Sequence, residues 1–328
     1  MTLLEGLMLA ALLALAAASA ILVRYRRELK RARHATQQGS LIAETAAGRI
    51  EYTAQGAGPT LFSIHGAGGG FDQGLVNAAV LVGGGFRIIA PSRFGYLRTP
   101  LPQDPSPAAQ ADAHAALLST LKVSKAVVLG VSAGARSALE LAVRRPDLVA
   151  ALILIVPAVY ASDNPVRVDE TRGSKFVFGI VNVGADFAWW AAQKAAPSML
   201  MRFVGVPPQC FAETSRTERN RAANIVASIQ PLSLRFPGIN IDSAPNLHEL
   251  PLEGIRAPTL IISARDDLFN TAPAAEYAAR RIKGARLAIY DTGGHLLVGR
   301  ADQARTEARA FLAGAGLIAP SLSAPVMR

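Results

Sequence analysis

Short runs of apolar residues alternate along most of this chain with segments whose apolar residues recur every three or four positions. Runs of this kind are typical of strands buried on both faces, and the longer period is typical of amphipathic helices. Strands alternating with helices predict a mostly parallel sheet covered by helices on both faces. The expected strands are "PTLFSIHG", "GFRIIAP", "KAVVLGVS", "AALILIVP", "PTLIISA" and "ARLAIYD", after a hairpin in "SLIAETAAGRIEYTA". The expected helices cover residues 106–121, 133–145, 274–282 and 301–313.

One long segment interrupts this alternation. Residues 162–250 contain no convincing buried strand and consist of amphipathic stretches rich in Phe, Trp, Met and Arg. A connection of this length has structure of its own or a function. We therefore expect a helical cap over residues 162–250, inserted between two parts of one α/β core at residues 39–161 and 251–328.

The chain begins with a different pattern. Residues Leu3–Val23 form an apolar stretch of the length that spans a bilayer as a helix, and the basic block "RYRRELKRAR" follows. Because a secretory signal peptide carries its cations before the apolar run, the order favours a membrane anchor over a cleaved signal or a peripheral helix. Residues 1–38 are thus expected to form a single-pass anchor and a basic juxtamembrane segment that attracts anionic lipid. The positive-inside rule places the large domain on the cytoplasmic side.

Composition agrees with a globular protein and weakens one alternative. Hydrophobic residues make up 51% of the 328 positions and charged residues 18%, which suits a large core. The formal charge of +10 suggests nucleic-acid binding, but the densest basic run is the flank of the anchor, so we expect no nucleic-acid partner. Cys210 is the only cysteine, which excludes an intrachain disulfide and suits a reducing compartment.

The most informative polar residue lies where an apolar run meets a helix, in Gly130-Val131-Ser132-Ala133-Gly134. A sharp strand-to-helix turn needs small neighbours on both sides and exposes the hydroxyl at its tip. The following helix N-terminus offers backbone N–H groups to an anion. Ser132 is therefore a candidate nucleophile, and the alternative is an ordinary N-cap serine.

A second polar feature, "HGAGGG" (His65–Gly70), also follows an expected strand. Its glycines leave backbone amides accessible to an oxyanion, and we choose the amides of Ala67 and Ala133, with Gly68 if the loop is shifted. The alternatives are a phosphate-binding loop, for which the required Gly-Lys-Ser/Thr is missing, and a plain turn. His65 is expected to orient the loop rather than to react.

Two later strand ends supply an acid and a base. "ISARDDLF" places Asp266 and Asp267 after one expected strand, and "DTGGHLLVG" places His295 after the next. These residues complete a Ser, acid, His order along the chain. We favour Asp267 over Asp266 as the acid and expect the other carboxylate to be solvated or paired with Arg265. No metal cluster or dinucleotide fingerprint is present, so no metal or cofactor is expected.

These motifs, together with "PSRFGYLRTP", resemble the capped α/β hydrolases, a family that includes esterases, epoxide hydrolases, haloalkane dehalogenases and carbon–carbon bond hydrolases. The resemblance covers about Leu41 to Gly314. It implies that Ser132 attacks a carbonyl, His295 carries the proton and Asp267 holds the imidazole. Ala264 departs from the glycine that many members have before the acid turn, which leaves the choice of aspartate open. Serine as nucleophile argues against dehalogenases and epoxide hydrolases, which use aspartate there.

The expected activity is serine-dependent hydrolysis of an ester or related acyl bond in a small hydrophobic substrate. A carbon–carbon bond hydrolase or acyltransferase with the same triad is an alternative, and so is a non-catalytic ligand receptor on the same fold. The cap aromatics Phe187, Trp189 and Trp190 either line an apolar pocket or pack a small core. The cap arginines are expected to be solvated, with one of them available to a substrate carboxylate. They are Arg202, Arg216, Arg219, Arg221 and Arg235.

Overall fold

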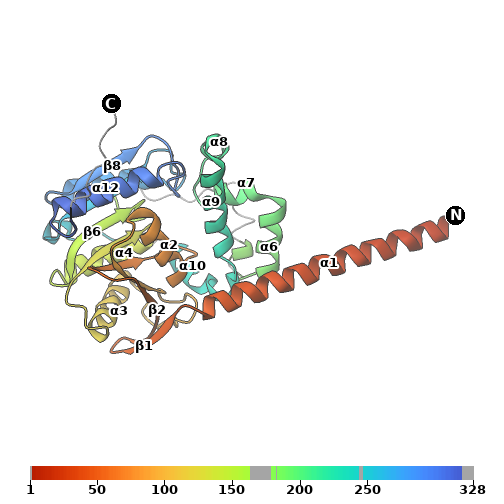
Figure 1. Ribbon diagram of the computed structural model, residues 1–328, viewed down its shortest axis with the longest axis horizontal. Helices are drawn as coiled ribbons and strands as arrows, with labels where there is room; N and C mark the ends of the chain where they lie inside the picture. The colour runs from red at the N-terminus through yellow and green to blue at the C-terminus, as the bar shows by residue number, and fades with distance from the viewer. Residues whose placement is uncertain (1, 163–178, 182, 244–246, 320–328) are drawn as a thin grey trace.

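An eight-stranded sheet forms the centre of the protein (Figure 1). The computed structural model describes residues 2–162, 179–181, 183–243 and 247–319. The strand order is β1-β2-β4-β3-β5-β6-β7-β8, and only the β1/β2 and β2/β4 pairs are antiparallel. The strands are β1 (Leu41–Thr45), β2 (Gly48–Gln55), β3 (Thr60–Ile64), β4 (Arg87–Pro91), β5 (Ala126–Val131), β6 (Val149–Ile155), β7 (Thr259–Ala264) and β8 (Arg286–Tyr290).

Helices cover both faces of this sheet because its central strands are apolar on both sides. In β5, Val128 packs into the core on one face and Leu129 into the core on the other. The helices of the first face are α3 (Pro107–Thr120), α4 (Gly134–Arg144) and α11 (Thr271–Arg281). Those of the second face are α2 (Phe71–Leu81) and α12 (Ala301–Gly314). The predicted α/β class is confirmed, although α2 was not predicted.

Between β6 and β7, the described residues form mainly helices. These helices enclose a third apolar cluster, which contains Trp189, Leu200 and Val226. Residues 163–178, 182 and 244–246 of the expected cap lie outside the described residues. The described elements are α6 (Asp186–Ala195), α7 (Pro197–Phe203), α8 (Pro208–Glu213), α9 (Arg216–Ser228), η1 (Leu232–Leu234) and α10 (Phe236–Ser243), with η2 (Leu252–Gly254) just before β7.

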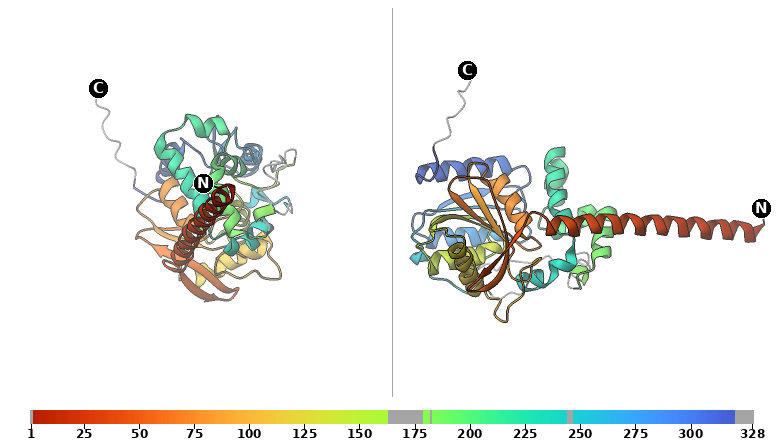
Figure 2. Two further views of the ribbon diagram at one scale, coloured as in Figure 1. Left: turned by 90° about the vertical axis from the view of Figure 1, so that its right-hand side faces the viewer. Right: turned by 60° about the horizontal axis from the view of Figure 1, so that its bottom comes forward.

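Helix α1 (Leu3–Gln37) begins at a capping box. The Thr2 hydroxyl accepts from the Glu5 N–H, and the Glu5 carboxylate accepts from the Thr2 N–H at 2.8 Å. The apolar half of α1 projects away from the body, and only the basic half lies against it (Figures 1 and 2). Within the described residues α1 is the one helix long and apolar enough to cross a membrane, a property that anchors and signal sequences share. The helix continues to Gln37, through most of the polar stretch that follows the basic block.

Candidate active site

Ser132 lies at the turn between β5 and α4, with its backbone in the left-handed region at φ 53°. Strained angles at a non-glycine residue persist only where the surrounding structure enforces them. A Cβ at Gly130 would lie 2.7 Å from the Ala138 Cβ, and a Cβ at Gly134 would lie 2.4 Å from the His65 carbonyl oxygen. Glycine at both positions thus lets strand, helix and neighbouring loop meet closely enough to present the hydroxyl.

Three predicted residues from separate loops meet at this turn. The Ser132 Oγ lies 2.8 Å from the Nε2 of His295, and the His295 Nδ1 lies 2.8 Å from the Oδ2 of Asp267. Asp267 also accepts from the Phe269 N–H at 2.9 Å and from the Thr271 hydroxyl. Asp267 and His295 are buried and Ser132 is partly exposed. The arrangement lets the imidazole take a proton from the serine while the carboxylate holds the ring.

Asp266 has a different environment from its neighbour. Its carboxylate accepts from the backbone N–H groups of Gly294 at 2.8 Å and Gly293 at 3.2 Å. The expected pairing with Arg265 is wrong, because Arg265 pairs with Glu276 and lies 3.8 Å from Asp291. Asp266 is half-buried, so its carboxylate is partly solvated as well as bonded to the two amides. Asp266 contacts the loop before His295 and does not contact the histidine ring.

The glycine-rich loop provides backbone donors beside Ser132. Ala67, Gly68 and Ala133 line the cavity that Ser132 and His295 also line. The Gly68 N–H donates to the Tyr96 hydroxyl at 3.3 Å, whereas the N–H groups of Ala67 and Ala133 donate to no other group in the described ranges. Ala67 and Ala133 are therefore the donors available to an oxyanion.

His65 is buried at the base of this loop. Its Nε2 accepts from the Arg93 N–H at 2.9 Å, and its Nδ1 lies 2.7 Å from the Gly66 carbonyl oxygen. Burial, reinforced by the charge of Arg93, holds the pKa of His65 well below its usual value. The neutral ring thus joins the glycine loop to the segment after β4.

Buried ion pairs that sequence patterns did not predict support the same loop. Arg93 pairs with Asp242 of α10 at 2.9 and 2.5 Å, and Asp242 also accepts from the Tyr96 hydroxyl, the group that contacts Gly68. Arg235, expected to be solvated, is fully buried. It donates to the Gly69 carbonyl at 2.6 Å and to both carboxylate oxygens of Asp72 at 2.7 and 3.2 Å.

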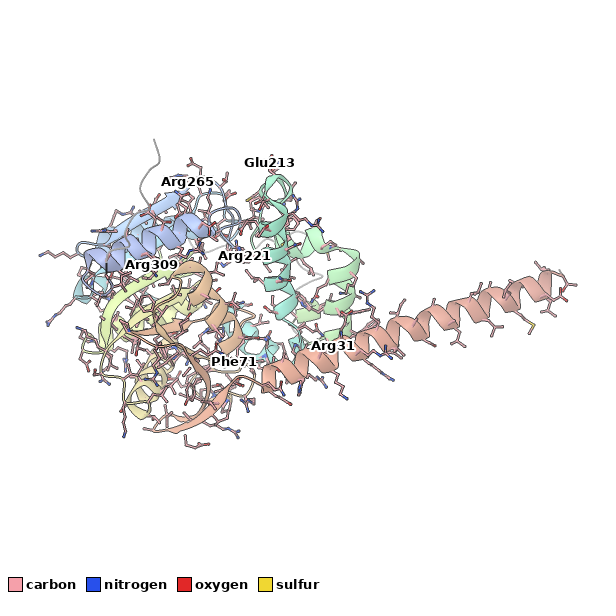
Figure 3. The ribbon with its side chains drawn as sticks, in the orientation of Figure 1. Arg31, Phe71, Glu213, Arg221, Arg265 and Arg309 are labelled. Atoms are coloured by element: carbon pink, nitrogen blue, oxygen red, sulfur yellow. The ribbon has the colours of Figure 1, made fainter. Side chains whose placement is uncertain are left out.

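The cap also contacts the loops that carry the acid and the histidine. The Gly205 carbonyl accepts from the His295 N–H at 3.0 Å and from the Leu268 N–H at 3.2 Å. On α9, Arg221 pairs with Glu218 and donates to the Leu296 and Leu297 carbonyls at 2.9 and 3.2 Å (Figure 3). The Glu218 carboxylate in turn accepts from the Gly299 N–H at 2.9 Å. These hydrogen bonds hold the loops that carry Asp267 and His295 against the cap.

A cavity of about 190 Å³ lies between the core and the cap helices above Ser132. Trp189 contributes to its wall as well as to the cap core, whereas Trp190 and Phe187 contact α1 instead. Within the described residues no group of three His, Cys, Asp or Glu side chains is placed to hold a metal. The apolar residues that line the cavity are Val76, Val80, Val181, Trp189, Phe203, Ile225, Ile229 and Ile239, among others.

Comparisons with known proteins agree with this architecture. Residues 61–308 match the model of a family described as the alpha/beta hydrolase family. An epoxide hydrolase of Caballeronia sordidicola is 30% identical over 168 residues, which are 49% of this chain and 51% of that protein, so the match spans about half of the relative. A pimeloyl-[acyl-carrier protein] methyl ester esterase of Aromatoleum aromaticum is 30% identical over 241 residues, 72% of this chain and 91% of that protein.

Solved structures show the same fold. An alpha/beta hydrolase fold protein from Nakamurella multipartita superposes with a TM-score of 0.66 at 27% identity, covering 84% of this chain and 99% of that one. A membrane phospholipase A described as a bacterial virulence factor superposes with a TM-score of 0.63 at 20% identity, covering 96% of this chain and all of that one (100%). At that identity the second likeness is one of fold.

Proposed function

The chain belongs to the alpha/beta hydrolase family, and we propose that it hydrolyses a carboxylic ester or a related acyl bond in a small hydrophobic substrate. The observation that supports the proposal most directly is the hydrogen-bonded series from the Ser132 Oγ through His295 to Asp267. In this proposal Ser132 is the nucleophile, His295 the general base and acid, and Asp267 the residue that orients the ring.

The first half of the reaction forms an acyl-enzyme. The Ser132 Oγ attacks the carbonyl carbon while its proton moves to the His295 Nε2. The carbonyl oxygen becomes an oxyanion and accepts from the N–H groups of Ala67 and Ala133. When the tetrahedral intermediate collapses, the carbon–oxygen bond to the alcohol breaks, and the alcohol leaves with the proton from His295.

The second half releases the acid. A water molecule gives a proton to His295 and attacks the acyl carbon, and the oxyanion again accepts from the two backbone amides. Collapse of this intermediate breaks the bond to the Ser132 Oγ, which recovers its proton from His295. The enzyme returns to its starting state with no cofactor consumed.

The nucleophile favours acyl transfer over epoxide opening. A serine hydroxyl activated by histidine suits attack on a carbonyl, whereas alkyl transfer in this family uses a carboxylate. Of the two named relatives, the methyl ester esterase thus has the chemistry closer to this proposal. The apolar cavity wall favours a substrate with a hydrophobic acyl or alcohol group.

Helix α1 suggests where in the cell the proposed reaction takes place. Its first half exposes a continuous apolar surface, and none of this stretch is buried against the body. We assign it to a single-pass membrane anchor, because the basic residues follow the apolar stretch. The catalytic domain is then held at a membrane surface, where hydrophobic substrates concentrate.

A fluorophosphonate probe tests the nucleophile. Ser132→Ala should abolish labelling, because the probe phosphonylates an activated serine hydroxyl. Ser243→Ala is the matched control, since Ser243 lines the same cavity but donates to the Ile239 carbonyl. Labelling that survives in Ser132→Ala and disappears in Ser243→Ala would overturn the assignment.

A panel of p-nitrophenyl esters of increasing acyl length tests the reaction class. We expect kcat/KM to rise with chain length until the cavity is filled, and to be lost in Ser132→Ala. Hydrolysis of a vinylogous diketone in the absence of any ester activity would assign the same residues to carbon–carbon bond cleavage instead.

A further inference from the structure

The basic half of α1 packs against the cap helix α6 through aromatic and polar contacts. The Tyr25 ring lies 5.1 Å from the ring of Phe187, edge to face, and 5.6 Å from that of Trp190. Glu28 accepts from the Trp190 indole N–H at 2.7 Å and pairs with Lys194 at 3.1 Å. Contacts spread over both helices hold α6 at one place along α1.

That place is the end of the apolar stretch. Tyr25 follows the last apolar residue, Val23, by two positions, or about 3 Å of helix, and helical side chains point back toward the N-terminus. The 21 residues from Leu3 to Val23 span about 31 Å, close to the thickness of the hydrocarbon layer. With the anchor inserted, the rings of Tyr25 and Phe187 lie in the headgroup region. Figure 1 shows α6 crossing α1 at the edge of the body from which the apolar half projects.

The surface around this crossing has the chemistry of an interfacial contact. Phe187 is 48% exposed despite its contacts, and Val183, just before α6, is 72% exposed. The nearby acidic side chains are paired: Glu28 as above, and Asp186 with Arg33 and with Ser233. Exposed cations lie on the adjoining turns of α1 and near the end of α6. Arg24 and Lys194 pair with Glu28, and Arg31 is labelled in Figure 3. The exposed cations are Arg24, Arg26, Arg27, Lys30, Arg31 and Lys194.

We propose that α6 and the basic half of α1 together form a surface that lies on an anionic phospholipid bilayer, with Phe187 and Val183 among the headgroups and the cations beside lipid phosphates. Aromatic side chains favour the membrane interface, and basic residues near an anionic surface strengthen binding to it. The proposal rests on the membrane anchor assigned above. It adds that the cap, not only the anchor, contacts the lipid, and so it fixes how the domain is oriented.

This orientation matters for the cavity because one side of α6 contacts α1 and another side lines the cavity. Phe187 and Trp190 face α1, while Trp189, between them in the helix, is fully buried and lines the cavity above Ser132. A single helix, about 10 Å across, therefore separates the cavity from the lipid surface.

Depth-dependent fluorescence quenching tests the surface in the full-length chain. Single cysteines are introduced into a Cys210→Ala background, labelled with the fluorophore NBD, and reconstituted into nanodiscs containing headgroup spin-labelled lipid. The test positions are Phe187→Cys and Val183→Cys, the second of which leaves Phe187 in place. Val23→Cys reports insertion of the anchor, and Leu287→Cys on β8 is the matched control, an exposed hydrophobic residue (40%) outside the proposed surface.

In discs of equal parts phosphatidylcholine and phosphatidylglycerol, we expect emission at 187 and 183 to be lost as strongly as at 23, and emission at 287 to be unchanged. Quenching at 23 with none at 187 and 183 would overturn the surface and leave the anchor in place. No quenching at 23 would overturn both. Equal quenching at 187 in discs of phosphatidylcholine alone would overturn the assignment to anionic lipid. Hydrolysis of a soluble ester by each labelled protein verifies the fold and is independent of these outcomes.

Discussion

Replacing Asp267 with asparagine separates its proposed role from that of Asp266. The Asp267 carboxylate accepts three hydrogen bonds, from the His295 ring, the Phe269 N–H and the Thr271 hydroxyl. An asparagine that keeps the bond from Phe269 presents its NH₂ to the histidine Nδ1. The ring then carries its proton on Nε2 and is unable to accept the proton of Ser132.

The expected loss is large and falls on kcat. The asparagine is nearly isosteric, so the buried site stays filled and substrate binding is little changed. A wrong tautomer at this position costs about 10⁴-fold in kcat in a serine protease, which corresponds to about 5 kcal/mol of transition-state stabilisation. We therefore expect Asp267→Asn to lower kcat by about 10³- to 10⁴-fold with a nearly constant KM.

Asp266→Asn is the matched control. Asp266 accepts from the Gly293 and Gly294 N–H groups, and an asparagine oxygen still accepts from them, without the charge. Hydrogen bonds to charged groups contribute about 1.5–3 kcal/mol, so partial loss lowers stability and shifts the histidine loop slightly. We expect kcat to fall by about tenfold or less.

The assay is steady-state hydrolysis of a p-nitrophenyl ester by both variants, with urea denaturation to measure the free energy of unfolding. An Asp267→Asn enzyme within tenfold of the parent kcat would refute the tautomer argument. The argument would also be refuted if Asp266→Asn lowered kcat as much as Asp267→Asn does while its free energy of unfolding stayed equal to that of the parent.

Three further changes probe the structure around the site. Gly134→Ala places a Cβ 2.4 Å from the His65 carbonyl oxygen, so urea denaturation should show that the free energy of unfolding falls by at least about 1–3 kcal/mol. Gly254→Ala is the control and should leave it unchanged, because nothing lies within 4 Å of the added Cβ. Arg235→Lys cannot bridge the Gly69 carbonyl and the Asp72 carboxylate together, so it should lower kcat about 10-fold at constant KM. An unchanged kcat would show that Arg235 does not support the glycine-rich loop (His65–Gly70) in the proposed reaction. Burial lowers the pKa of His114 to about 3, so between pH 6.5 and 3 only the unfolded chain binds this proton, and this residue lowers the free energy of unfolding by about 1.4 kcal/mol for each unit by which the pH falls. The buried His65 contributes in the same direction. His114→Asn should therefore reduce the loss of stability between pH 7 and pH 5 by about 2 kcal/mol in urea denaturation, and an unchanged loss would contradict this account.

The sheet was predictable because the residues of each central strand show which of its faces are buried. Val127 to Leu129 are apolar on both sides, and this pattern requires helices on both faces whatever the rest of the chain does. The turn around Ser132 was predictable for a similar reason, because Gly130 and Gly134 indicate that strand, helix and neighbouring loop pack too closely there for a side chain.

Helix α2 lacked such a local pattern. Its core-facing positions include the small residues Gly74 and Ala78, while Val76 and Val80 face the cavity. Apolar residues therefore occur on two sides of the helix, and no single stripe with a period of 3.6 stands out.

Contacts between distant segments were also beyond sequence patterns. Arg235 stands between Leu234 and Phe236, and these apolar neighbours do not show which group would pair with a buried arginine. Its partner Asp72 lies more than 160 positions away along the chain. Likewise, the choice between Asp266 and Asp267 depends on which carboxylate the histidine loop approaches, and adjacent residues of one turn give no local indication of that.

The Gly205 carbonyl, shared by the amides of Leu268 and His295, has a consequence for engineering. A chimera that keeps this core but receives a foreign cap would lose the acceptor that both amides use. The proposed acid and base, Asp267 and His295, would then no longer be held in register, even with both residues retained. Cap exchange in this enzyme therefore has to carry residues 204–206 over with the core, and redesign of substrate preference is better confined to the wall formed by α9 and α6.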